Sequence, residues 1–210
     1  MNVFLEKEIA RNYDEYYKTK FGKKVDEAEK KIINSLIENI TPGNILDIGC
    51  GTGHWSVFLS EKGFGVTGID ISDAMLDLAK NKYPGMNFLK GNSQNLPFNN
   101  NSFDAVLSVT MLEFVDNIEK AVDEMYRVLK NSGYIIVGCL NKNSVIGKNK
   151  SNDPVFKNAV FLSTDMLHKV FHQFEITEIK TGVHLNDDYS FSDITENTEP
   201  AFIGIKAKKI

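Results

Sequence analysis

Hydrophobic residues recur at helical spacing from Val25 to Ile40, and Thr-Pro-Gly at 41–43 ends this segment. Amphipathic stretches at 72–83 and 118–129 also predict helices, the first of them opened by a serine. Short apolar runs bounded by Gly, Asn and Pro predict strands at 44–48, 65–69, 86–89 and 103–109. Apolar strands that alternate with helices indicate an α/β core, in which a mostly parallel, doubly wound sheet is covered on both faces.

The last third of the chain is less regular. Its pattern predicts, in order, a strand, a helix and two strands at 134–140, 165–173, 174–181 and 201–208. Segment 185–199 is too polar for a core and predicts a long surface loop. The irregular segments 141–160 and 185–199 fit either substrate-specific elements or flexible loops, and the pattern leaves both open.

Composition and charge narrow the class of protein. The chain has 210 residues, 42% of them hydrophobic and 25% charged, which predicts one globular domain. Its formal net charge of −4 gives no basic field for nucleic acid, so no nucleic-acid partner is expected. Two cysteines, Cys50 and Cys139, are too few for a disulfide scaffold. Without an apolar run of membrane length, and with charges at 6–8 where a secretory signal is apolar, the sequence predicts a cytoplasmic protein without a membrane span.

The clearest chemical signal is Ile-Leu-Asp-Ile-Gly-Cys-Gly-Thr-Gly at 45–53, a predicted strand that runs into Gly49, Gly51 and Gly53 and then into a helix. Glycines allow a tight turn and let a ligand lie against the backbone, while the helix start presents free N–H groups. Asp70 ends the next predicted strand, about 20 residues on, where one carboxylate can accept from both hydroxyls of a ribose. This combination predicts a nucleotide-like ligand.

Four ordered motifs extend this signal. They are Leu-Asp-Ile-Gly-Cys-Gly-Thr-Gly at 46–53, Gly-Ile-Asp-Ile-Ser at 68–72, Gly-Asn-Ser-Gln-Asn-Leu-Pro-Phe at 91–98 with Ser-Phe-Asp at 102–104, and Glu-Met-Tyr-Arg-Val-Leu-Lys at 124–130. Together they resemble the motifs of class I S-adenosylmethionine-dependent methyltransferases of the type 11 group. The resemblance implies S-adenosyl-L-methionine as cofactor and a Rossmann-like, doubly wound, seven-stranded, mostly parallel sheet with an antiparallel last strand.

The resemblance also implies a single domain over 1–210. Within it we expect an N-terminal helical lid or cap at 1–40, a cofactor-binding core at 41–140, and late strands with variable loops at 141–210. The core holds the recognisable cofactor motifs, so acceptor specificity is expected in the two flanking parts.

By position in the motifs, the resemblance assigns residues to the cofactor. Gly49, Gly51 and Gly53 would pack along its methionine and ribose. Asp47 would orient this loop or reach the amino group indirectly. Asp70 would hold the ribose hydroxyls.

The adenine and the methionine end of the cofactor draw on later motifs. The resemblance places Ile71 and Met75 beside the adenine, Asn92, Ser93 and Gln94 at its edge, and Ser108 and Val109 at the methionine end. A methionine at the helical spacing of Met75 is also typical of plain core. The sequence departs from the family pattern at Asn92, where an acidic residue is usual, although an amide carbonyl can still accept from an amine.

Catalysis with this cofactor requires alignment for direct in-line displacement and no protein nucleophile. Glu113, just after the strand at 103–109, is the candidate general base, and an ordinary helix-start carboxylate is the alternative. Tyr13 belongs to an aromatic stretch that resembles a family segment folding over the cofactor, and packing on the sheet is the alternative. His168 and His172 have no third ligand motif, so no metal site is predicted.

The expected function is methyl transfer to a small-molecule acceptor, with the acceptor, its attacking atom and the oligomeric state left open. One alternative is a nicotinamide-dependent oxidoreductase, which shares the strand, glycine loop and acidic residue. A dinucleotide fingerprint, however, would need its third glycine at the position of His54. The other alternative is a non-catalytic S-adenosylmethionine-binding protein, suggested by the Asn92-Ser93 pair and the absence of a clear base.

Overall fold

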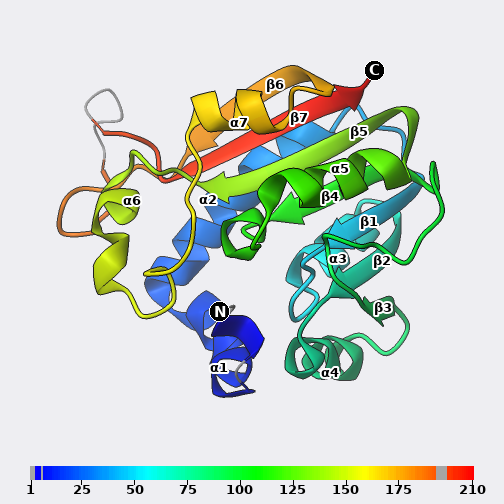
Figure 1. Ribbon diagram of the computed structural model, residues 1–210. Coiled ribbons are helices and arrows are strands. Elements are labelled where there is room, and N and C mark those ends of the chain that lie inside the picture. The colour runs from blue at the N-terminus through cyan, green and yellow to red at the C-terminus, as the bar shows by residue number, and fades with distance from the viewer. Residues whose placement is uncertain (1–2, 6, 193–197) are drawn as a thin grey trace.

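The computed structural model describes residues 3–5, 7–192 and 198–210, which build a seven-stranded sheet (Figure 1). Its strands are β1 (Asn44–Ile48), β2 (Gly65–Asp70), β3 (Asn87–Lys90), β4 (Phe103–Val109), β5 (Leu129–Leu140), β6 (Phe174–Gly182) and β7 (Phe202–Lys209). They lie in the order β3-β2-β1-β4-β5-β7-β6. The pairs among β1 to β5 are parallel, and β7 runs antiparallel to both β5 and β6. The predicted α/β class and the antiparallel last strand are confirmed.

Helices cover both faces of the sheet. They are α2 (Lys20–Ile37), α3 (His54–Glu61), α4 (Asp73–Lys82), α5 (Ile118–Val128) and α7 (Thr164–Val170). Buried side chains of α5 and α7, such as Met125 and Leu167, pack in one core, and those of α2 and α3, such as Leu36 and Leu59, pack in another. Each such side chain contributes about 1.5–3 kcal/mol through burial.

The remaining helices lie around the ends of the strands (Figure 1). They are η1 (Val3–Leu5), α1 (Lys7–Lys18), η2 (Leu112–Phe114), α6 (Val145–Asn149) and η3 (Lys150–Asn152). Five α-helices begin at a polar side chain that accepts a hydrogen bond from the backbone N–H three residues on, namely Thr19, Ser72, Asn117, Ser144 and Ser163. Such caps satisfy N–H groups that have no partner within the helix, so they fix where each helix starts.

Some predicted boundaries differ from the structure. The helix predicted from Val25 to Ile40 spans Lys20–Ile37, because the Thr19 cap starts it earlier than the apolar pattern does. The strand predicted at 134–140 begins at Leu129, because β5 continues through the Asn-Ser-Gly turn at 131–133 with an irregular pairing against β4.

The two irregular segments contribute to the core, which polarity alone did not predict. Leu185 is buried and Phe191 packs against the same core, so the prediction of a wholly surface-exposed loop at 185–199 is wrong at this point; residues 193–197 lie outside the described residues. In segment 141–160, Ala159 and Ile146 pack with Leu140 in a small separate cluster.

Arg127 ties α5 to the segment that precedes β4. Its guanidinium donates to both carboxylate oxygens of Glu124 at 2.7 Å, and to the carbonyls of Leu96 at 2.9 Å and Phe98 at 2.7 Å. We expect Arg127→Leu to lower the free energy of unfolding by about 2 kcal/mol, since several acceptors lose a charged donor. Urea denaturation measures this loss. Arg127→Lys, which keeps the charge without the planar fork, should recover only a part of it, and an unchanged midpoint in both variants would contradict this role.

Candidate active site

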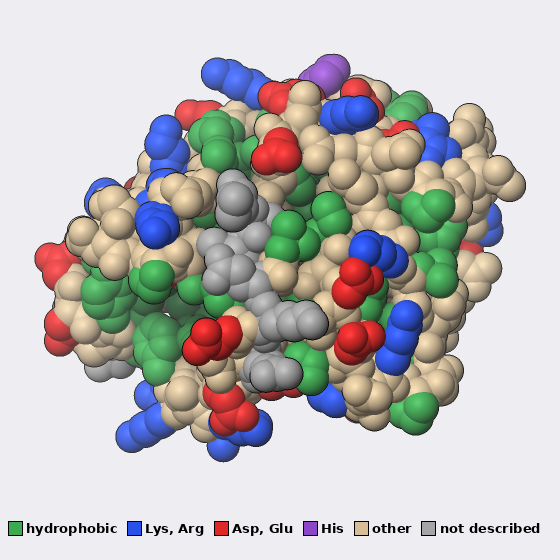
Figure 2. Space-filling model, turned by 60° about the horizontal axis from the view of Figure 1, so that its bottom comes forward, with side chains coloured by type: hydrophobic (Ala, Val, Ile, Leu, Met, Phe, Trp, Pro, Cys, Tyr) green, Lys and Arg blue, Asp and Glu red, His purple; other side chains and the backbone are tan. Residues whose placement is uncertain are grey.

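A cavity of about 1010 Å³ lies at the carboxyl ends of the parallel strands. Its wall includes the ends of β1, β2, β4 and β5, through Ile48, Asp70, Val109 and Leu140, and it also includes residues of η1, α1 and α2. The order of the strands reverses beside β1, and ligands of open α/β sheets bind in the crevice outside the strand ends at such a point. Figure 2 shows hydrophobic side chains around a hollow on this side of the molecule, with acidic side chains close by.

The glycine loop forms one end of the cavity. Gly49, Gly51 and Gly53 all have left-handed backbone conformations, with φ of 75°, 53° and 86°. A Cβ on Gly49 would lie 2.3 Å from the side chain of Met111, whereas a Cβ on Gly51 would meet nothing within 4 Å. The loop is therefore built for glycine by both conformation and space, and at Gly51 a ligand can approach the backbone directly.

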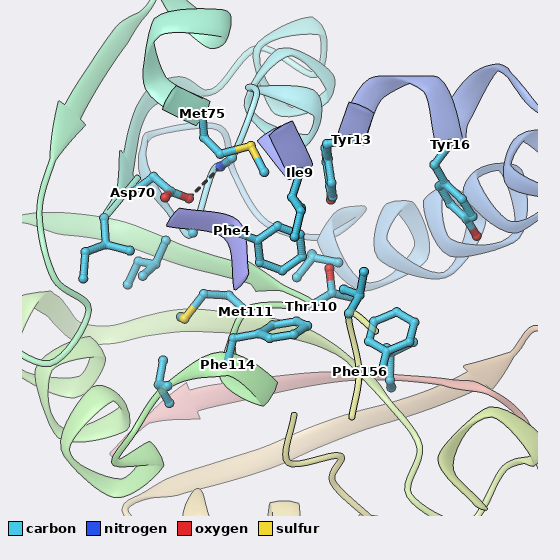
Figure 3. Close-up of a pocket in the computed structure, with 18 of the residues that line it drawn as sticks. Phe4, Ile9, Tyr13, Tyr16, Asp70, Met75, Thr110, Met111, Phe114 and Phe156 are labelled. Carbon is cyan, nitrogen blue, oxygen red and sulfur yellow. Dashed lines mark hydrogen bonds between the residues drawn. The ribbon is translucent and has the colours of Figure 1, made fainter. Parts of the chain in front are cut away.

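Asp70, the last residue of β2, faces this loop. Its Oδ2 accepts from the backbone N–H of Gly51 at 2.9 Å (Figure 3). Its Oδ1 accepts from the backbone N–H of Ser72 at 2.8 Å. Burial raises the pKa of the carboxyl, and the hydrogen bonds from these N–H groups oppose that rise. Asp70 thus fixes the loop conformation and also lies on the cavity wall.

The structure brings most of the predicted cofactor residues to this one cavity. Those on its wall are Tyr13, Gly49, Gly51, Asp70, Ile71, Met75, Asn92, Ser93, Gln94 and Val109. Four predicted site residues are not among the lining residues, namely Asp47, Gly53, Ser108 and Glu113.

Asp47 and Gly53 support the loop from behind. The hydroxyl of Ser56 donates to Asp47 at 2.5 Å, which connects β1 to α3, and burial raises the pKa of Asp47 to about 7. Gly53 is the N-cap of α3, where a Cβ would lie 2.9 Å from the ring of Phe88. Ser108 is buried, and its hydroxyl has no hydrogen bond among the described residues. Neighbouring strand residues point to opposite faces, so Val109 reaches the cavity where Ser108 does not.

Glu113 lies in η2 and is buried away from the cavity wall. Its Oε1 accepts from the backbone N–H of Leu140 at 2.6 Å, while its Oε2 has no partner among the described residues. Burial raises its pKa to about 7. In this arrangement the carboxyl fixes the end of β5, and the structure does not place it where a general base would meet an acceptor in the cavity.

The departure at Asn92 has a local structural consequence. The side-chain carbonyl of Asn92 accepts from the backbone N–H of Gln94 at 2.9 Å, which stabilises a turn after β3. A carbonyl oxygen has two lone pairs, so the Asn92 oxygen can accept from an adenine amine while it also accepts from Gln94.

Aromatic side chains line the other end of the cavity. Figure 3 shows Phe4 between Asp70 and Met75 on one side and Tyr16 and Phe156 on the other. The ring of Phe4 lies edge-on to that of Tyr13 at 5.8 Å between ring centroids. The ring of Phe4 also lies edge-on to that of Phe114, just after β4, at 4.9 Å between ring centroids. Aromatic pairs of this geometry add about 0.5–1.5 kcal/mol beyond burial, so this second contact holds the N-terminal segment on the cavity.

Sequence reasoning missed Glu29 of α2, which lies on the cavity wall and is 8% exposed. Burial, together with the charges of Asp26 and Glu113, raises its pKa to about 8. A signal was present in the sequence, because Glu29 interrupts the apolar helical stripe that contains Val25 and Ile32. The missed Thr110 and Phe114 also line the cavity, just after β4.

Two predictions from the sequence, of no metal site and no membrane span, concern the part of the chain that the structure describes. In that part, no group of three or more His, Cys, Asp or Glu is arranged to hold a metal ion. No helix within the described ranges has both the length and the apolar character to cross a membrane. His168 and His172 are exposed on and after α7.

A doubly wound sheet with a glycine loop after β1 and an acidic residue at the end of β2 defines a nucleotide-cofactor-binding protein. The family model described as "Methyltransferase domain", of the type 11 group, matches residues 46–137. The chain is 32% identical to an uncharacterized protein of Methanocaldococcus jannaschii over 222 aligned residues, and this alignment covers all of both chains. It is also 32% identical to the demethylmenaquinone methyltransferase of Chlorobaculum tepidum, over 69% of this chain and 58% of that protein.

A solved structure agrees with these relatives. The crystal structure of a SAM-dependent methyltransferase of Thermotoga maritima, described as a possible histamine N-methyltransferase, superposes with a TM-score of 0.76 at 28% identity. The superposition covers 98% of this chain and 99% of that chain. The chain therefore belongs to the class I S-adenosylmethionine-dependent methyltransferases of the type 11 group, and S-adenosyl-L-methionine is its cofactor.

The residues present fit this cofactor. The open space at Gly51 leaves room for a ligand against the backbone, and the Asp70 carboxylate lies beside it on the cavity wall. Gly49, Gly51 and Asp70 are thus the residues that the geometry offers for its methionine and ribose. The family assignment replaces the nicotinamide alternative.

Proposed function

We propose that the protein transfers a methyl group from S-adenosylmethionine to a small organic acceptor that binds in the aromatic end of the cavity. The observation that carries this proposal is the continuity of the cavity, which runs from Asp70 and the glycine loop to Tyr16 and Phe156. The methyltransferase relatives include one named for demethylmenaquinone, a small molecule. The chain spans 58% of that relative's length, so the proposal does not extend to demethylmenaquinone as the acceptor of this protein.

When bound, the cofactor supplies a methyl group on a positively charged sulfur, which already reacts with nucleophiles. The work left to this chain is to hold the cofactor, orient the acceptor and exclude water. Asp70 and the glycine loop would hold the ribose and methionine. The apolar wall formed by residues such as Phe114, Phe156 and Phe202 would exclude water from the acceptor and favour direct in-line displacement.

We further propose that η1 and α1 act as the cover of this cavity. The Asp14 carboxylate of α1 accepts from the hydroxyl of Thr52 in the glycine loop at 2.6 Å and from Lys82 of α4 at 2.7 Å. The backbone carbonyl of Phe4 accepts from the Ser72 hydroxyl at 2.7 Å. The cover thus rests on the same two loops that carry the cofactor residues.

This arrangement predicts that the cofactor stabilises the cover. We expect S-adenosylhomocysteine to slow amide hydrogen exchange in α1 by about tenfold or more, because ligand binding stabilises the closed state by mass action. Exchange measured by mass spectrometry tests this, with α7 on the remote part of the sheet as internal control. Equal protection of both helices, or of neither, would show that α1 is ordinary packing and not a cover.

Turnover with an extract tests the methyl transfer itself. The protein is incubated with S-adenosylmethionine and either the ultrafiltered small-molecule fraction of a cell extract or the retained macromolecular fraction. We expect S-adenosylhomocysteine to form with the small-molecule fraction. Formation only with the retained fraction would indicate a macromolecular acceptor, and formation with neither would favour a binding protein without catalysis.

A further inference from the structure

The carboxyl of Glu29 lies inside the cavity, and no described residue pairs with it. Its side chain is more than nine-tenths buried on the face of α2 that packs toward the sheet, and no described residue gives it a hydrogen bond or an ion pair. Its carboxyl oxygens are not among the fully buried unpaired atoms of the described residues, so they reach the space of the cavity, where a ligand can donate hydrogen bonds to them. Its position on the cavity wall indicates that a ligand supplies the missing partner.

The charged side chains on the described part of the cavity wall have one sign. This described part of the wall carries the carboxyl side chains of Glu8, Glu29, Asp70, Asp116 and Asp153, and contains no Lys, Arg or His. Clefts lined by one sign of charge concentrate ligands of the opposite sign. An acceptor that carries a carboxylate or phosphate would therefore be repelled, and a cationic acceptor would be attracted.

Tyrosines surround the Glu29 side of the cavity. Tyr13 and Tyr17 share a hydrogen bond between their hydroxyls at 3.1 Å, and the ring of Tyr16 lies edge-on to that of Tyr17 at 5.4 Å. The charge of Glu29 raises the pKa of all three tyrosines, in addition to the larger effect of burial, so all three lie within its field and stay neutral. Aromatic faces attract cations, with about 0.5–2 kcal/mol for each good contact.

The Glu29 group is distinct from Asp70 and the glycine loop, and Tyr13 lies between them, since the charges of both Glu29 and Asp70 raise its pKa. Glu29 and the tyrosines come from α1 and α2, whereas Asp70 and the glycines come from the ends of β1 and β2. Figure 3 shows Tyr16 and Asp70 at opposite ends of the cavity. The cofactor machinery therefore leaves the Glu29 carboxyl for a second molecule.

We propose that Glu29 and the tyrosines of α1 form the acceptor subsite, and that the acceptor is an amine that enters as an ammonium ion on an apolar body. This rests on the methyl transfer proposed above. The ammonium group donates hydrogen bonds to the Glu29 carboxylate and lies against the tyrosine rings. Before transfer, one proton would pass from the ammonium group to that carboxylate, and the freed nitrogen lone pair would form the new N–C bond as the S–C bond of the cofactor breaks. The apolar body lies along the wall that includes Val25, Phe156 and Phe202. Glu29 then selects amines over alcohols and acids of the same shape.

Calorimetry on the protein saturated with S-adenosylhomocysteine tests this selection. The probes are two matched sets, phenethylamine with phenethyl alcohol and hydrocinnamate, and hexylamine with hexanol and heptanoate. We expect at least one amine to bind about tenfold or more tightly than the alcohol and acid of its own set, as one charge-assisted hydrogen bond provides. Equal binding within both sets, or binding of the acids alone, would overturn the proposal, and so would a failure of every amine to bind.

Two variants on the same helix locate the effect. Glu29→Gln keeps the shape of the side chain and should lower the amine affinity about tenfold or more, while leaving the affinity for S-adenosylhomocysteine within about twofold. Glu27→Gln removes an exposed charge two residues away and should change neither affinity. Circular dichroism and S-adenosylhomocysteine binding confirm that each variant is folded.

The same variants separate this proposal from its rivals. If Glu29→Gln weakens the binding of S-adenosylmethionine but not that of S-adenosylhomocysteine, which lacks the sulfonium charge, Glu29 neutralises the cofactor's sulfonium and the acceptor proposal is wrong. If the unmodified protein binds neither cofactor form, the proposed methyl transfer fails first. Amine selection that persists in Glu29→Gln would place the acceptor elsewhere.

Discussion

Substitution of Asp70 by alanine is expected to lower the affinity for S-adenosylmethionine by about 100-fold or more. The variant removes the acceptor proposed for the ribose hydroxyls, and charge-assisted hydrogen bonds contribute about 1.5–3 kcal/mol each. It also removes the carboxylate that holds the N–H groups of Gly51 and Ser72, so the glycine loop loses its fixed shape. Calorimetric titration of both proteins with the cofactor measures the difference.

Asp73→Ala is the matched control for this prediction. Asp73 lies three residues further on, and its carboxylate forms an exposed ion pair with Lys90. Exposed pairs of this kind contribute about 0–1 kcal/mol, so cofactor affinity should stay within about threefold. If Asp70→Ala unfolds at the same temperature as the native protein and binds the cofactor as tightly as Asp73→Ala does, Asp70 is not part of the cofactor site.

The cofactor-free protein is expected to lose stability as the pH rises from about 4 to about 8. Burial raises the pKa of Asp47 and Glu113 to about 7, and that of Glu29 to about 8, from ordinary values of 3.8 for Asp and 4.5 for Glu. Between the ordinary and the raised pKa the folded state holds more protons than the unfolded state, so the free energy of unfolding falls with pH. Below the ordinary values this contribution is fully present, and above the raised values it is lost. For Glu113 alone the expected loss is roughly 3 kcal/mol.

Urea denaturation at pH 5 and pH 8 measures this slope, with Glu113→Gln as the matched variant. The amide oxygen of glutamine can still accept from Leu140, but the side chain does not titrate, so the variant should lose less stability than the native protein over this interval. A native protein equally stable at both pH values would mean that these carboxyls are better solvated than the packing indicates.

The core of the fold could be predicted because its signals are local. The strands at 44–48 and 103–109 and the helix start at Ser72 agree with the structure, since apolar runs, glycine turns and a capping serine act within a few residues. The strands at 134–140, 174–181 and 201–208 were also predicted from local apolar runs. The burial of Leu185 was not predicted, because it depends on contacts with α2 and β7 that no local pattern contains.

The site residues also fall into those that a local pattern predicts and those that depend on distant contacts. The glycine loop and Asp70 were predicted from one strand–turn–helix unit and its neighbour, where sequence spacing determines spatial proximity. Glu113 was predicted as a base from its position after β4, but its orientation is determined by the backbone of Leu140, 27 residues away. Glu29 was missed because its place on the cavity wall depends on the packing of α2 against β5, β6 and β7, although a glutamate in an apolar stripe was the available sign.

A crystal structure with bound S-adenosylhomocysteine tests the central claim most directly. We expect the ribose hydroxyls within hydrogen-bond distance of the Asp70 carboxylate, the ligand chain against the backbone at Gly49 and Gly51, and the sulfur facing the part of the cavity that contains Glu29 and Tyr16. A ligand bound away from Asp70, or a sulfur that faces the exterior with Glu29 beyond its reach, would contradict the account.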